Sequence, residues 1–452
     1  MKSITLQQVI NAVNGTFMGD PALLEREITD VSIDSRTIKN NALFVAIKGD
    51  RFDGHTFIPD VLTKGALAAI SSQPAEGNII LVSDTLEAYQ KLAAFYRSLY
   101  DIPFIGITGS VGKTTTKELV STVLSQRFNT HKNIGNLNNQ TGVPQTLFKL
   151  EESHETAVIE MGTNHFGEID SLAKMVQPNI CIITNIGESH IEFLGSKEGI
   201  LKAKSEMFTH RKPDSKIIVN GNDPLLRTLI GKYPELITYG IGPECDIYAT
   251  DLKENALEGT HFTAHFIGQT AEIFVPAPGE YMVQNALCAL ATGLSLGMDI
   301  QAIKDGIASF QPTAGRMHII RKQDLTIIND AYNANPTSMS ASIKTVCGLD
   351  GRSVLILRDM FELGEKELEY HKQMGEFAAA QKADLLLCVG KLSFEMYMGA
   401  ISKGCRAMYF ANKDILLREL PELLEDGDTI LIKASHSMHL DEVAKWLDEN
   451  FE

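Results

Sequence analysis

The stretch Gly106-Ile107-Thr108-Gly109-Ser110-Val111-Gly112-Lys113-Thr114-Thr115-Thr116 decides how we interpret this chain. It ends an apolar, strand-like run over 102–107 and precedes a helix-like run over 117–126. Glycines let backbone N–H groups wrap around phosphate oxygens, a lysine adds positive charge, and a threonine hydroxyl can ligate Mg²⁺. The full G-x-x-x-x-G-K-[ST] spacing is not met, because Ile107 stands five positions before Gly112. A glycine-rich turn before an ordinary helix is the alternative, but the strand, helix and three threonines favour an ATP site.

Length and composition limit the class of protein. A chain of 452 residues is too long for one core and suggests about three domains. The formal net charge of -16 argues against non-specific binding to nucleic acid or to an anionic membrane. The first fifteen residues lack the apolar core of a signal peptide, and no run approaches the ~18 apolar residues of a membrane span. Six scattered cysteines without a C-x-x-C pair indicate a reducing, cytoplasmic location.

The order of strand-like and helix-like runs predicts an α/β fold. In residues 1–84 we expect strands at 43–47, 68–71 and 79–82 and a helix at 57–64. A helix over 85–100 leads into apolar strands at 157–160, 180–184 and 216–219, an alternation that predicts a parallel sheet covered on both faces. Residues 246–275 have only strand-like alternation, which predicts a meander, and helices follow at 284–297 and 300–310.

Residues 311–315 are typical of a linker, and the β/α alternation resumes after them. The expected strands lie at 325–328, 354–357, 385–389 and 429–432, and the helices at 338–346, 368–380, 414–424 and 441–451. This pattern predicts a second doubly wound sheet. We therefore expect three domains: a small α/β domain (1–84), a central P-loop-type parallel-sheet ATPase domain (85–312) and a C-terminal Rossmann-like α/β domain (313–452).

Several polar residues stand where the predicted strands end. Glu160 could ligate Mg²⁺ beside the phosphate loop or could be a solvated carboxylate. His190 follows another strand and, taken alone, is more typical of a satisfied polar residue than of a metal ligand. Arg316, just after the linker, could stabilise a transferring phosphoryl group. Asp330-Ala331-Tyr332-Asn333-Ala334-Asn335-Pro336 is a binding loop or a plain turn.

Other polar residues give weaker local signals. Lys202 and Lys204 lie on an expected helix over 197–208, where an exposed charged face is the ordinary interpretation. In the first domain, Asp34-Ser35-Arg36 and the segment 49–55 are more typical of turns with solvated charge than of a site.

Taken together, these motifs resemble those of the Mur ligases, the ATP-dependent amide-forming enzymes of peptidoglycan precursor synthesis. The resemblance covers essentially the whole chain. Its most specific segments are 109–117 (GSVGKTTTK), 135–144 (GNLNNQTGVP), 160–165 (EMGTNH), 184–190 (TNIGESH) and 330–339 (DAYNANPTSM). Within the family, the Glu-Met-Gly and Tyr-Asn-Ala-Asn-Pro forms resemble the member that adds D-alanyl-D-alanine.

The resemblance implies a role for each matching residue. For the nucleotide, it implies contacts from Gly109, Ser110, Val111, Gly112, Lys113, Thr114, Thr115, Asn285 (adenine), Arg316 (γ-phosphate) and Asp330 (ribose). For magnesium, it implies Thr114 and Glu160 at one ion, and His190 with a CO₂-derived carbamylated Lys204 at a second. For the UDP-muramoyl-peptide it implies Ser35, Arg36, Gly54, His55, Asn138, Asn139 and Thr141, with Asn333 and Asn335 lining the same cleft as the nucleotide. Lys113, His190, Lys204 and Arg316 would be the catalytic residues.

The implied reaction joins D-Ala-D-Ala to UDP-N-acetylmuramoyl-tripeptide. The tripeptide carboxylate attacks the γ-phosphate of ATP, and the dipeptide amine then displaces phosphate from the acyl phosphate. Two metals and cationic side chains would neutralise the charge gathered in this step. We expect a cytoplasmic monomer that binds no nucleic acid and does not insert into a membrane.

Three positions depart from the family pattern. Arg358 stands where glycine is common, Lys433-Ala434-Ser435-His436 stands where Lys-Gly-Ser-Arg is common, and Tyr281-Met282 replaces a frequent His-Asn. The same chemistry allows a sister ligase that adds lysine or diaminopimelate, or a folylpolyglutamate synthase, although the segment 330–336 argues against these. A non-catalytic nucleotide-dependent scaffold is the alternative from another class. Retention of Lys113, Glu160, His190 and Lys204 together argues against it.

Overall fold

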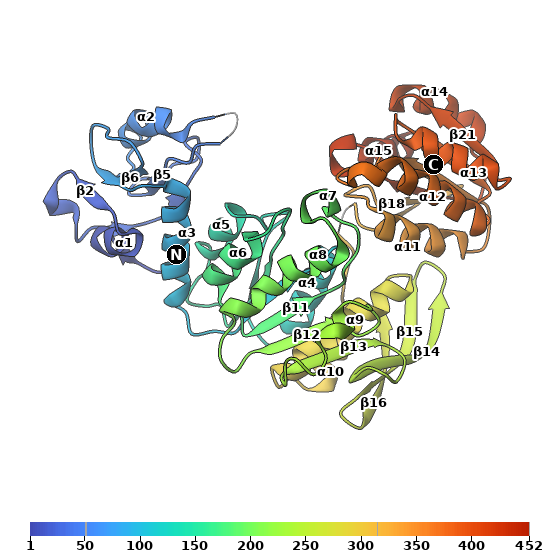
Figure 1. Cartoon of the computed structure of the whole chain (residues 1–452), viewed down its shortest axis with the longest axis horizontal. Coiled ribbons are helices and arrows are strands. Elements are labelled where there is room, and N and C mark those ends of the chain that lie inside the picture. The colour runs from blue at the N-terminus through green and yellow to red at the C-terminus, as the bar shows by residue number, and fades with distance from the viewer. Residues whose placement is uncertain (50–51, 314, 452) are drawn as a thin grey trace.

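The computed structural model describes residues 1–49, 52–313 and 315–451. Three α/β domains follow one another along the chain, each built on its own main sheet, and the central domain lies between the other two (Figure 1). We call them the N-terminal, central and C-terminal domains. Among the described residues, no helix is both long and apolar enough to cross a lipid bilayer. The predicted fold class is confirmed.

The N-terminal domain contains a five-stranded sheet in the order β2-β7-β6-β5-β4, with β2 as its antiparallel edge. The strands are β2 (Thr16–Met18), β4 (Val31–Ser32), β5 (Leu43–Val45), β6 (Ala68–Ser71) and β7 (Ile79–Leu81), and β1 (Ile4–Thr5) pairs with β3 (Glu27–Ile28) in a separate sheet. The helices are α1 (Leu6–Val13) and α2 (Ile58–Thr63), with 3₁₀ segments η1 (Pro21–Leu23) and η2 (Gly54–Phe57). Sequence patterns did not reveal α1, although Thr5 and Gln8 form a capping box at its start.

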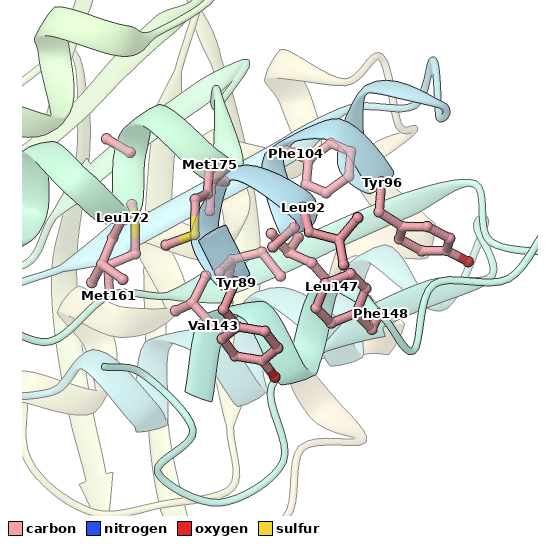
Figure 2. Close-up of a cluster of buried hydrophobic side chains, with 14 of the residues drawn as sticks. Tyr89, Leu92, Tyr96, Phe104, Val143, Leu147, Phe148, Met161, Leu172 and Met175 are labelled. Carbon is pink, nitrogen blue, oxygen red and sulfur yellow. The ribbon is translucent and has the colours of Figure 1, made fainter. Parts of the chain in front are cut away.

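Helix α3 (Thr85–Ser98) joins the N-terminal domain to the central one. Its buried residues Tyr89, Leu92 and Tyr96 pack against Phe148 and the neighbouring apolar side chains (Figure 2). One hydrophobic core runs through both domains because these side chains contact residues of each. Arg97 adds a polar clamp, since its guanidinium donates to the carbonyls of Val176 and Gln177 at 2.7 and 3.2 Å. The position of the central sheet is thereby fixed relative to the first domain.

The central domain is built on a nine-stranded sheet in the order β16-β15-β14-β13-β12-β11-β8-β10-β9. The strands are β8 (Phe104–Thr108), β9 (Thr130–Lys132), β10 (Thr156–Glu160), β11 (Ile180–Ile183), β12 (Lys216–Asn220), β13 (Leu236–Ile241), β14 (Ile247–Asn255), β15 (Gly259–Phe266) and β16 (Gln269–Val275). Strands β8 to β14 pair in parallel, whereas β14, β15 and β16 form the predicted antiparallel meander. Strand β8 lies between β10 and β11, so the chain reverses its direction of winding at the carboxyl end of β8, where α/β proteins bind ligands.

Helices cover both faces of the parallel part of this sheet, as predicted. One face carries α4 (Lys113–Leu124), α9 (Glu280–Ser295) and α10 (Ile300–Ala308); the other carries α3, α5 (Gly142–Leu147), α6 (Glu168–Val176) and α8 (Lys197–Ser205) with η3 (Glu206–His210). Successive residues of β8 alternate between the two cores: Phe104 packs on the second face, and Ile105 and Ile107 on the first. The central domain also contains the short helices α7 (Ile191–Leu194) and η4 (Leu226–Leu229).

The C-terminal domain has a six-stranded sheet in the order β17-β18-β22-β19-β20-β21, in which β17 alone pairs antiparallel among the described strands. The strands are β17 (His318–Arg321), β18 (Leu325–Asn329), β19 (Ser353–Arg358), β20 (Leu385–Val389), β21 (Ala407–Phe410) and β22 (Asp428–Lys433). The helices are α11 (Pro336–Cys347), α12 (Glu367–Ala380), α13 (Ser393–Ser402), α14 (Lys413–Leu423) and α15 (Asp441–Asn450), with η5 (Gly364–Lys366) and η6 (His436–Met438). They form two cores on opposite faces of the sheet.

Some local predictions were wrong. The helix after the phosphate loop begins at Lys113 instead of residue 117, because Gly112 enters the helix directly from a left-handed φ of 81°. The sequence patterns also missed the edge strand β17, and α13 and β21, although Gly390 and Gly404 mark turns on either side of α13. Residue 314 of the expected linker and residues 50–51 of the segment 49–55 lie outside the described residues.

Candidate active site

The phosphate loop, residues 109–112, connects β8 to α4 and is held by the segment that follows β11. The backbone N–H of Ser110 donates to the carbonyl of Asn185 at 3.1 Å, and the N–H of Val111 donates to the Asn185 side-chain oxygen at 2.9 Å. The Thr184 hydroxyl donates to the Val111 carbonyl at 2.6 Å. Because β11 is the direct neighbour of β8, these bonds fix the loop at the carboxyl end of the sheet.

Glycine is required at two positions in this loop. A Cβ on residue 109 would lie 1.9 Å from the Thr184 hydroxyl oxygen, so no larger residue fits without movement. Gly112 adopts a φ of 81° as the residue that precedes α4. The loop therefore turns tightly onto the N-terminus of α4, where backbone N–H groups and the helix dipole favour an anion.

Lys113 is the first residue of α4 and lines the same loop. Its ammonium group donates to the carbonyls of Gly109 and Ser110, at 2.8 and 3.4 Å. Burial lowers the pKa of Lys113, and the charge of Arg316 adds to this effect, while Glu160 opposes it. A lysine in these surroundings gains stability from a nearby anion such as a phosphate.

Glu160 ends β10, next to β8 on the other side, as predicted. Its side chain is only 1% exposed, and one carboxylate oxygen accepts a hydrogen bond from the Asn138 amide at 2.7 Å. The other oxygen is buried without a hydrogen-bond partner, and the nearest cation, Lys117 Nζ, is 3.9 Å away. An unpaired buried carboxylate oxygen that lines a cleft fits a hard cation such as Mg²⁺.

The described residues contain no group of three or more His, Cys, Asp or Glu side chains arranged to hold a metal ion. A cation beside Glu160 would therefore complete its coordination with other oxygens, such as the Thr114 hydroxyl and phosphate oxygens. This ligand set is typical of Mg²⁺ at a nucleotide and not of an all-protein metal cage.

A cleft of about 750 Å³ separates the phosphate loop from the C-terminal domain. Arg316 crosses it, with its guanidinium donating to the Thr114 hydroxyl at 2.9 Å and stacking 3.9 Å from the Tyr332 ring centre. Most of the predicted site residues line this cleft: Ser110, Val111, Gly112, Lys113, Thr114, Thr115, Asn138, Asn139, Glu160, His190, Asn285, Arg316, Asp330, Asn333 and Asn335. Asn285, on α9, also accepts a hydrogen bond from the Thr116 hydroxyl at 3.1 Å.

Lys204 is not on an exposed face, so that local expectation was wrong. It is 1% exposed, on α8, and is not among the residues that line the cleft. No hydrogen bond or ion pair among the described residues involves its ammonium group. Burial, with a further contribution from the charge of Lys113, lowers the pKa of Lys204 well below its ordinary value. Helical spacing places Lys204 on the same face as Ile200, but the cost of burying a charge without a partner argued against its burial.

His190 lines the cleft as the residue that precedes α7, and it contacts the C-terminal domain. Its Nδ1 lies 2.5 Å from a carboxylate oxygen of Glu362. Glu188 and Ser189, which precede His190, accept hydrogen bonds from the C-terminal domain. Thr337 donates to Glu188 at 2.6 Å, and the Asn335 amide donates to the Ser189 hydroxyl at 2.5 Å. The segment after β11 therefore both anchors the phosphate loop and docks the C-terminal domain.

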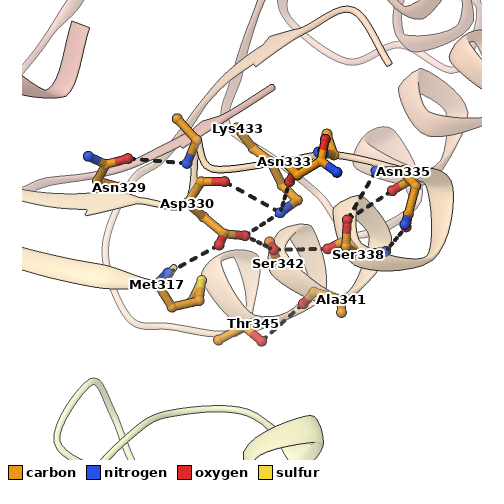
Figure 3. Close-up of polar contacts among 12 residues, drawn as sticks. Met317, Asn329, Asp330, Asn333, Asn335, Ser338, Ala341, Ser342, Thr345 and Lys433 are labelled. Atoms are coloured by element: carbon orange, nitrogen blue, oxygen red, sulfur yellow. Dashed lines mark hydrogen bonds and ion pairs between the residues drawn. The ribbon is translucent and has the colours of Figure 1, made fainter. Parts of the chain in front are cut away.

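Asp330 follows β18 and is the centre of a buried polar network (Figure 3). Its carboxylate accepts from the Met317 N–H at 3.1 Å, the Ser342 hydroxyl at 2.6 Å and the Lys433 ammonium at 2.5 Å. Lys433, at the end of neighbouring β22, also donates to the Asn333 carbonyl at 3.2 Å. These contacts hold the loop 330–335 against the sheet and present its amides to the cleft.

The four site residues predicted in the N-terminal domain lie apart from this cleft. The Arg36 side chain is 86% exposed and pairs with Asp34 at 2.7 Å, which lowers the Asp34 pKa to about 2. His55 Nδ1 is 2.6 Å from Asp53, and its Nε2 accepts the Ser72 N–H at 3.1 Å.

The other two, Ser35 and Gly54, lie in the same turns. The Ser35 carbonyl accepts from Lys64 at 3.2 Å. Gly54 approaches the Ile47 backbone so closely that a Cβ would lie 2.7 Å from its carbonyl. Thr141, also predicted as a substrate residue, precedes α5 and donates to the Asn139 side chain at 3.1 Å.

The departures from the family pattern take distinct positions. The Arg358 guanidinium donates to the Met438 carbonyl at 2.6 Å. The His436 ring lies 5.1 Å from the Tyr332 ring and lines the cleft. Tyr281 lines it from α9 with a buried hydroxyl that has no hydrogen-bond partner.

Sequence reasoning missed the roles of several residues at this site. Thr184 and Asn185 had the useful signal of a polar pair at the end of a strand, but their bonds to the phosphate loop depend on β11 lying beside β8. Lys433 stood in a segment compared with the family pattern, but its bond to Asp330 could not be predicted, and Glu362 gave no local signal, since each acts on a residue far away in the sequence.

The chain resembles known proteins along its whole length. Three family models match: the Mur ligase family catalytic domain over residues 27–97, the Mur ligase middle domain over 107–293, and the Mur ligase glutamate ligase domain over 315–436. The UDP-N-acetylmuramoyl-tripeptide–D-alanyl-D-alanine ligase of Bacillus subtilis is 38% identical to this chain. The matched region covers 99% of this chain and 98% of the Bacillus subtilis protein. The enzyme of the same name from Escherichia coli is 35% identical, and the matched region covers 100% of this chain and 99% of the Escherichia coli protein.

Solved structures have the same fold. A crystal structure of MurF from Acinetobacter baumannii superposes with a TM-score of 0.93 at 33% identity, over 100% of both chains. MurF ligase from Thermotoga maritima in complex with ADP superposes with a TM-score of 0.85 at 25% identity, over 93% of this chain and 97% of that one. The chain belongs to the Mur ligase family.

Proposed function

We propose that this protein joins D-alanyl-D-alanine to UDP-N-acetylmuramoyl-tripeptide in an ATP-dependent reaction, giving UDP-N-acetylmuramoyl-pentapeptide, ADP and phosphate for peptidoglycan synthesis. One observation carries the proposal: a single cleft brings the phosphate loop and Glu160 of the central domain together with Arg316 and the loop 330–335 of the C-terminal domain. Phosphoryl transfer depends on positioning and charge stabilisation, which such a cleft supplies from two sides. Relatives similar over their full length carry the name of this activity.

In this proposal the nucleotide lies along the cleft. Backbone N–H groups of residues 109–115 and Lys113 bind the β- and γ-phosphates, and Arg316 binds the γ-phosphate. Asn285 contacts adenine, and Asp330 contacts the ribose with oxygens that the network around it already orients. The N-terminus of α4 at Lys113 and the Arg316 guanidinium beside Thr114 both place positive charge at the phosphate-loop end of the cleft. This charge supports binding of the phosphates at that end.

Thr114 and Glu160 would hold one Mg²⁺, and His190 with Lys204 a second. When bound, Mg²⁺ supplies charge neutralisation for the triphosphate. The buried, unpaired Glu160 oxygen is the observation that supports the first ion.

For Lys204 the supporting observation is burial without a partner among the described residues. A neutral amine attacks CO₂ to form an N–C bond and releases a proton, which leaves a carbamate anion. The lowered pKa of Lys204 favours the neutral amine that this step needs, and the anion would then face the positive charge of Lys113.

The residues of the cleft suit both chemical steps. A tripeptide carboxylate oxygen forms a bond to the γ-phosphorus while the bond to the β-phosphate oxygen breaks, and Lys113 and Arg316 stabilise the charge that gathers there. The dipeptide amine then bonds to the acyl carbon, loses a proton, and inorganic phosphate leaves. Docking of the C-terminal domain keeps out water that would hydrolyse the acyl phosphate.

The remaining assignments complete the proposal. Ser35, Arg36, Gly54 and His55 hold the uridine diphosphate part, and Asn138, Asn139 and Thr141 face the muramoyl-peptide, with Asn333 and Asn335 on the opposite side. The proposed domain limits are 1–84, 85–312 and 313–452. ATP use and six free cysteines support a cytoplasmic location, and a monomeric state stays a prediction that sedimentation would test.

The direct test measures phosphate release from ATP and Mg²⁺ with UDP-N-acetylmuramoyl-tripeptide, with and without D-Ala-D-Ala, together with product mass. Tripeptides that carry lysine and diaminopimelate should both be offered. We expect release to require both substrates and the product mass to rise by one dipeptide residue. Release driven by another amine would assign the chain to a sister ligase, and no release with any amine would contradict ligase function.

The carbamate has its own test. Lys204→Ala should nearly abolish ligation, and short carboxylic acids should partly restore it. The matched control is Lys202→Ala on the same helix, because Lys202 is exposed. Carbon NMR with isotopically labelled bicarbonate should show a carbamate signal in the wild type and in the control that Lys204→Ala lacks. Full activity of Lys204→Ala would end this assignment.

A further inference from the structure

The C-terminal domain reaches the central domain through consecutive residues of the segment after β11. Ser189 contacts Asn335, Glu188 contacts Thr337, and His190 contacts Glu362. The segment η5, which follows Glu362, lies against α7, at the edge of the central domain nearest the C-terminal domain (Figure 1). Of these contacts, the His190–Glu362 pair is the one between two ionisable side chains at the cleft.

Both residues of this pair have unusual backbone conformations. His190 has a φ of 60° and Glu362 a φ of 62°, in the left-handed region that residues with a side chain seldom adopt. Such a conformation is strained and persists where the surroundings impose it. The side chains of these two residues meet, with Nδ1 2.5 Å from a carboxylate oxygen.

The contact defines which imidazole nitrogen is free. The contact is an ion pair whose alignment does not meet hydrogen-bond geometry. A carboxylate oxygen this close to Nδ1 still favours a proton on that nitrogen, which leaves the lone pair on Nε2. Because His190 lines the cleft, Nε2 is the nitrogen left for a ligand there. A histidine that binds a metal generally donates its other N–H to such a carboxylate, which fixes the tautomer and the ring orientation.

We propose that Glu362 is the positioning residue for His190, so that the C-terminal domain must dock before His190 can hold a divalent cation well. The inference rests on the proposed function, which assigns His190 to the second cation. It adds a carboxylate from another domain that acts through His190 and not on the substrate. Cation binding and domain docking then favour each other, because each stabilises the same arrangement of this pair.

The test measures the affinity for Mn²⁺, a spectroscopically visible substitute for Mg²⁺, by electron paramagnetic resonance in the presence of a non-hydrolysable ATP analogue. The variants are Glu362→Ala, Glu362→Gln, His190→Ala and the double variant, with Glu365→Gln as a control for the loss of one exposed charge nearby. Removal of a carboxylate that orients a metal-binding histidine costs about 10- to 100-fold in metal affinity. We expect that loss for Glu362→Ala, a smaller one for Glu362→Gln, whose amide oxygen can still face Nδ1 without the charge, and none for the control.

The double variant separates a positioning role from a general one. Glu362→Ala should have no further effect on Mn²⁺ affinity once His190 is alanine. The Glu362 side chain is 43% exposed, so the single variant should keep the wild-type melting temperature. Wild-type Mn²⁺ affinity in Glu362→Ala, with a loss in His190→Ala, would overturn this inference and leave the proposed function intact. Absence of ligation by the wild-type protein would instead overturn the proposed function.

Discussion

Replacement of Gly109 by alanine tests how the phosphate loop is built. The added Cβ would lie 1.9 Å from the Thr184 hydroxyl oxygen, whereas such contacts essentially never fall below 3.0 Å. The loop or Thr184 must therefore move by about 1 Å, and overpacking of this kind costs about 1–3 kcal/mol of stability. A displacement of about 1 Å in a group that positions a ligand costs about 100-fold, or about 2.7 kcal/mol.

We therefore expect Gly109→Ala to bind ADP with Mg²⁺ about 100-fold more weakly, as measured by isothermal titration calorimetry, and to unfold at lower urea concentration. Thr184→Ala removes the obstructing hydroxyl and should cost about 1 kcal/mol through its lost bond to Val111. In that background the nearest atoms to the new Cβ are Thr184 Cβ and N, at 3.1 and 3.2 Å. The double variant should therefore recover about 1–2 kcal/mol relative to the sum of the single ones.

Gly49→Ala is the control for a glycine replaced by alanine, because its nearest neighbouring atom would be 3.7 Å away, an ordinary van der Waals contact. It should change neither ADP affinity nor stability by more than about 0.5 kcal/mol. The reasoning fails if Gly109→Ala binds ADP like the wild type, or if its defect is the same with and without the Thr184 hydroxyl. The second outcome would mean that the cost comes from the backbone of residue 109, whose φ of 157° strains any residue with a side chain, and not from the contact with Thr184.

Three further predictions concern other parts of the chain. Arg316→Lys should raise the KM for ATP about tenfold or more in a steady-state assay, because lysine can neither stack on Tyr332 nor present a planar fork beside Thr114. Burial lowers the pKa of His131 from 6.5 to about 4, so the stability that neutral His131 contributes is complete above about pH 6.5 and falls by up to about 3 kcal/mol as the pH drops through 4. Urea titrations should therefore show a flatter pH dependence for His131→Gln. Gly375→Ala should destabilise the protein by about 2–3 kcal/mol in thermal melts, because its Cβ would lie 1.8 Å from the Met396 carbonyl where α12 packs on α13. The control is Ala378→Gly on the same helix, which removes a Cβ and so introduces no such overlap.

The sequence predicted the sheets better than the site. Apolar runs such as 180–184 and 385–389 are buried on both faces, so their composition alone predicts parallel strands. Glu160 could be placed at a strand end for the same reason. The partner of a residue across the cleft is different, because it depends on which strands become neighbours and how two domains meet. The contacts of Arg316 with Thr114, and of Glu362 with His190, have no local pattern that could predict them.

Lys204 is a second case in which the sequence alone predicted the surroundings of a residue wrongly. Its helix has the sequence Lys-Glu-Gly-Ile-Leu-Lys-Ala-Lys-Ser, which is polar enough to predict exposure, yet Lys202 is exposed and Lys204 is buried. One helical face carries Ile200, Ala203 and Lys204 into the core. Helical periodicity could assign residue 204 to the face of residue 200, but burial of a charge without a partner is so costly that composition argues against it. Such exceptions are expected at functional sites.

The electrostatics of the cleft connect these observations. Burial lowers the pKa of Lys113 beside the phosphate loop, and the nearby charge of Arg316 lowers it further. Glu160 opposes this charge but keeps one oxygen unpaired. Positive groups gathered in this way cost stability in the free protein and are relieved by an anion, so the fold is already prepared for a triphosphate. Because Arg316 belongs to the C-terminal domain, docking of that domain adds positive charge to the same place. Domain closure should therefore be more favourable after the nucleotide has bound than before, which is the order that protects an acyl phosphate from water.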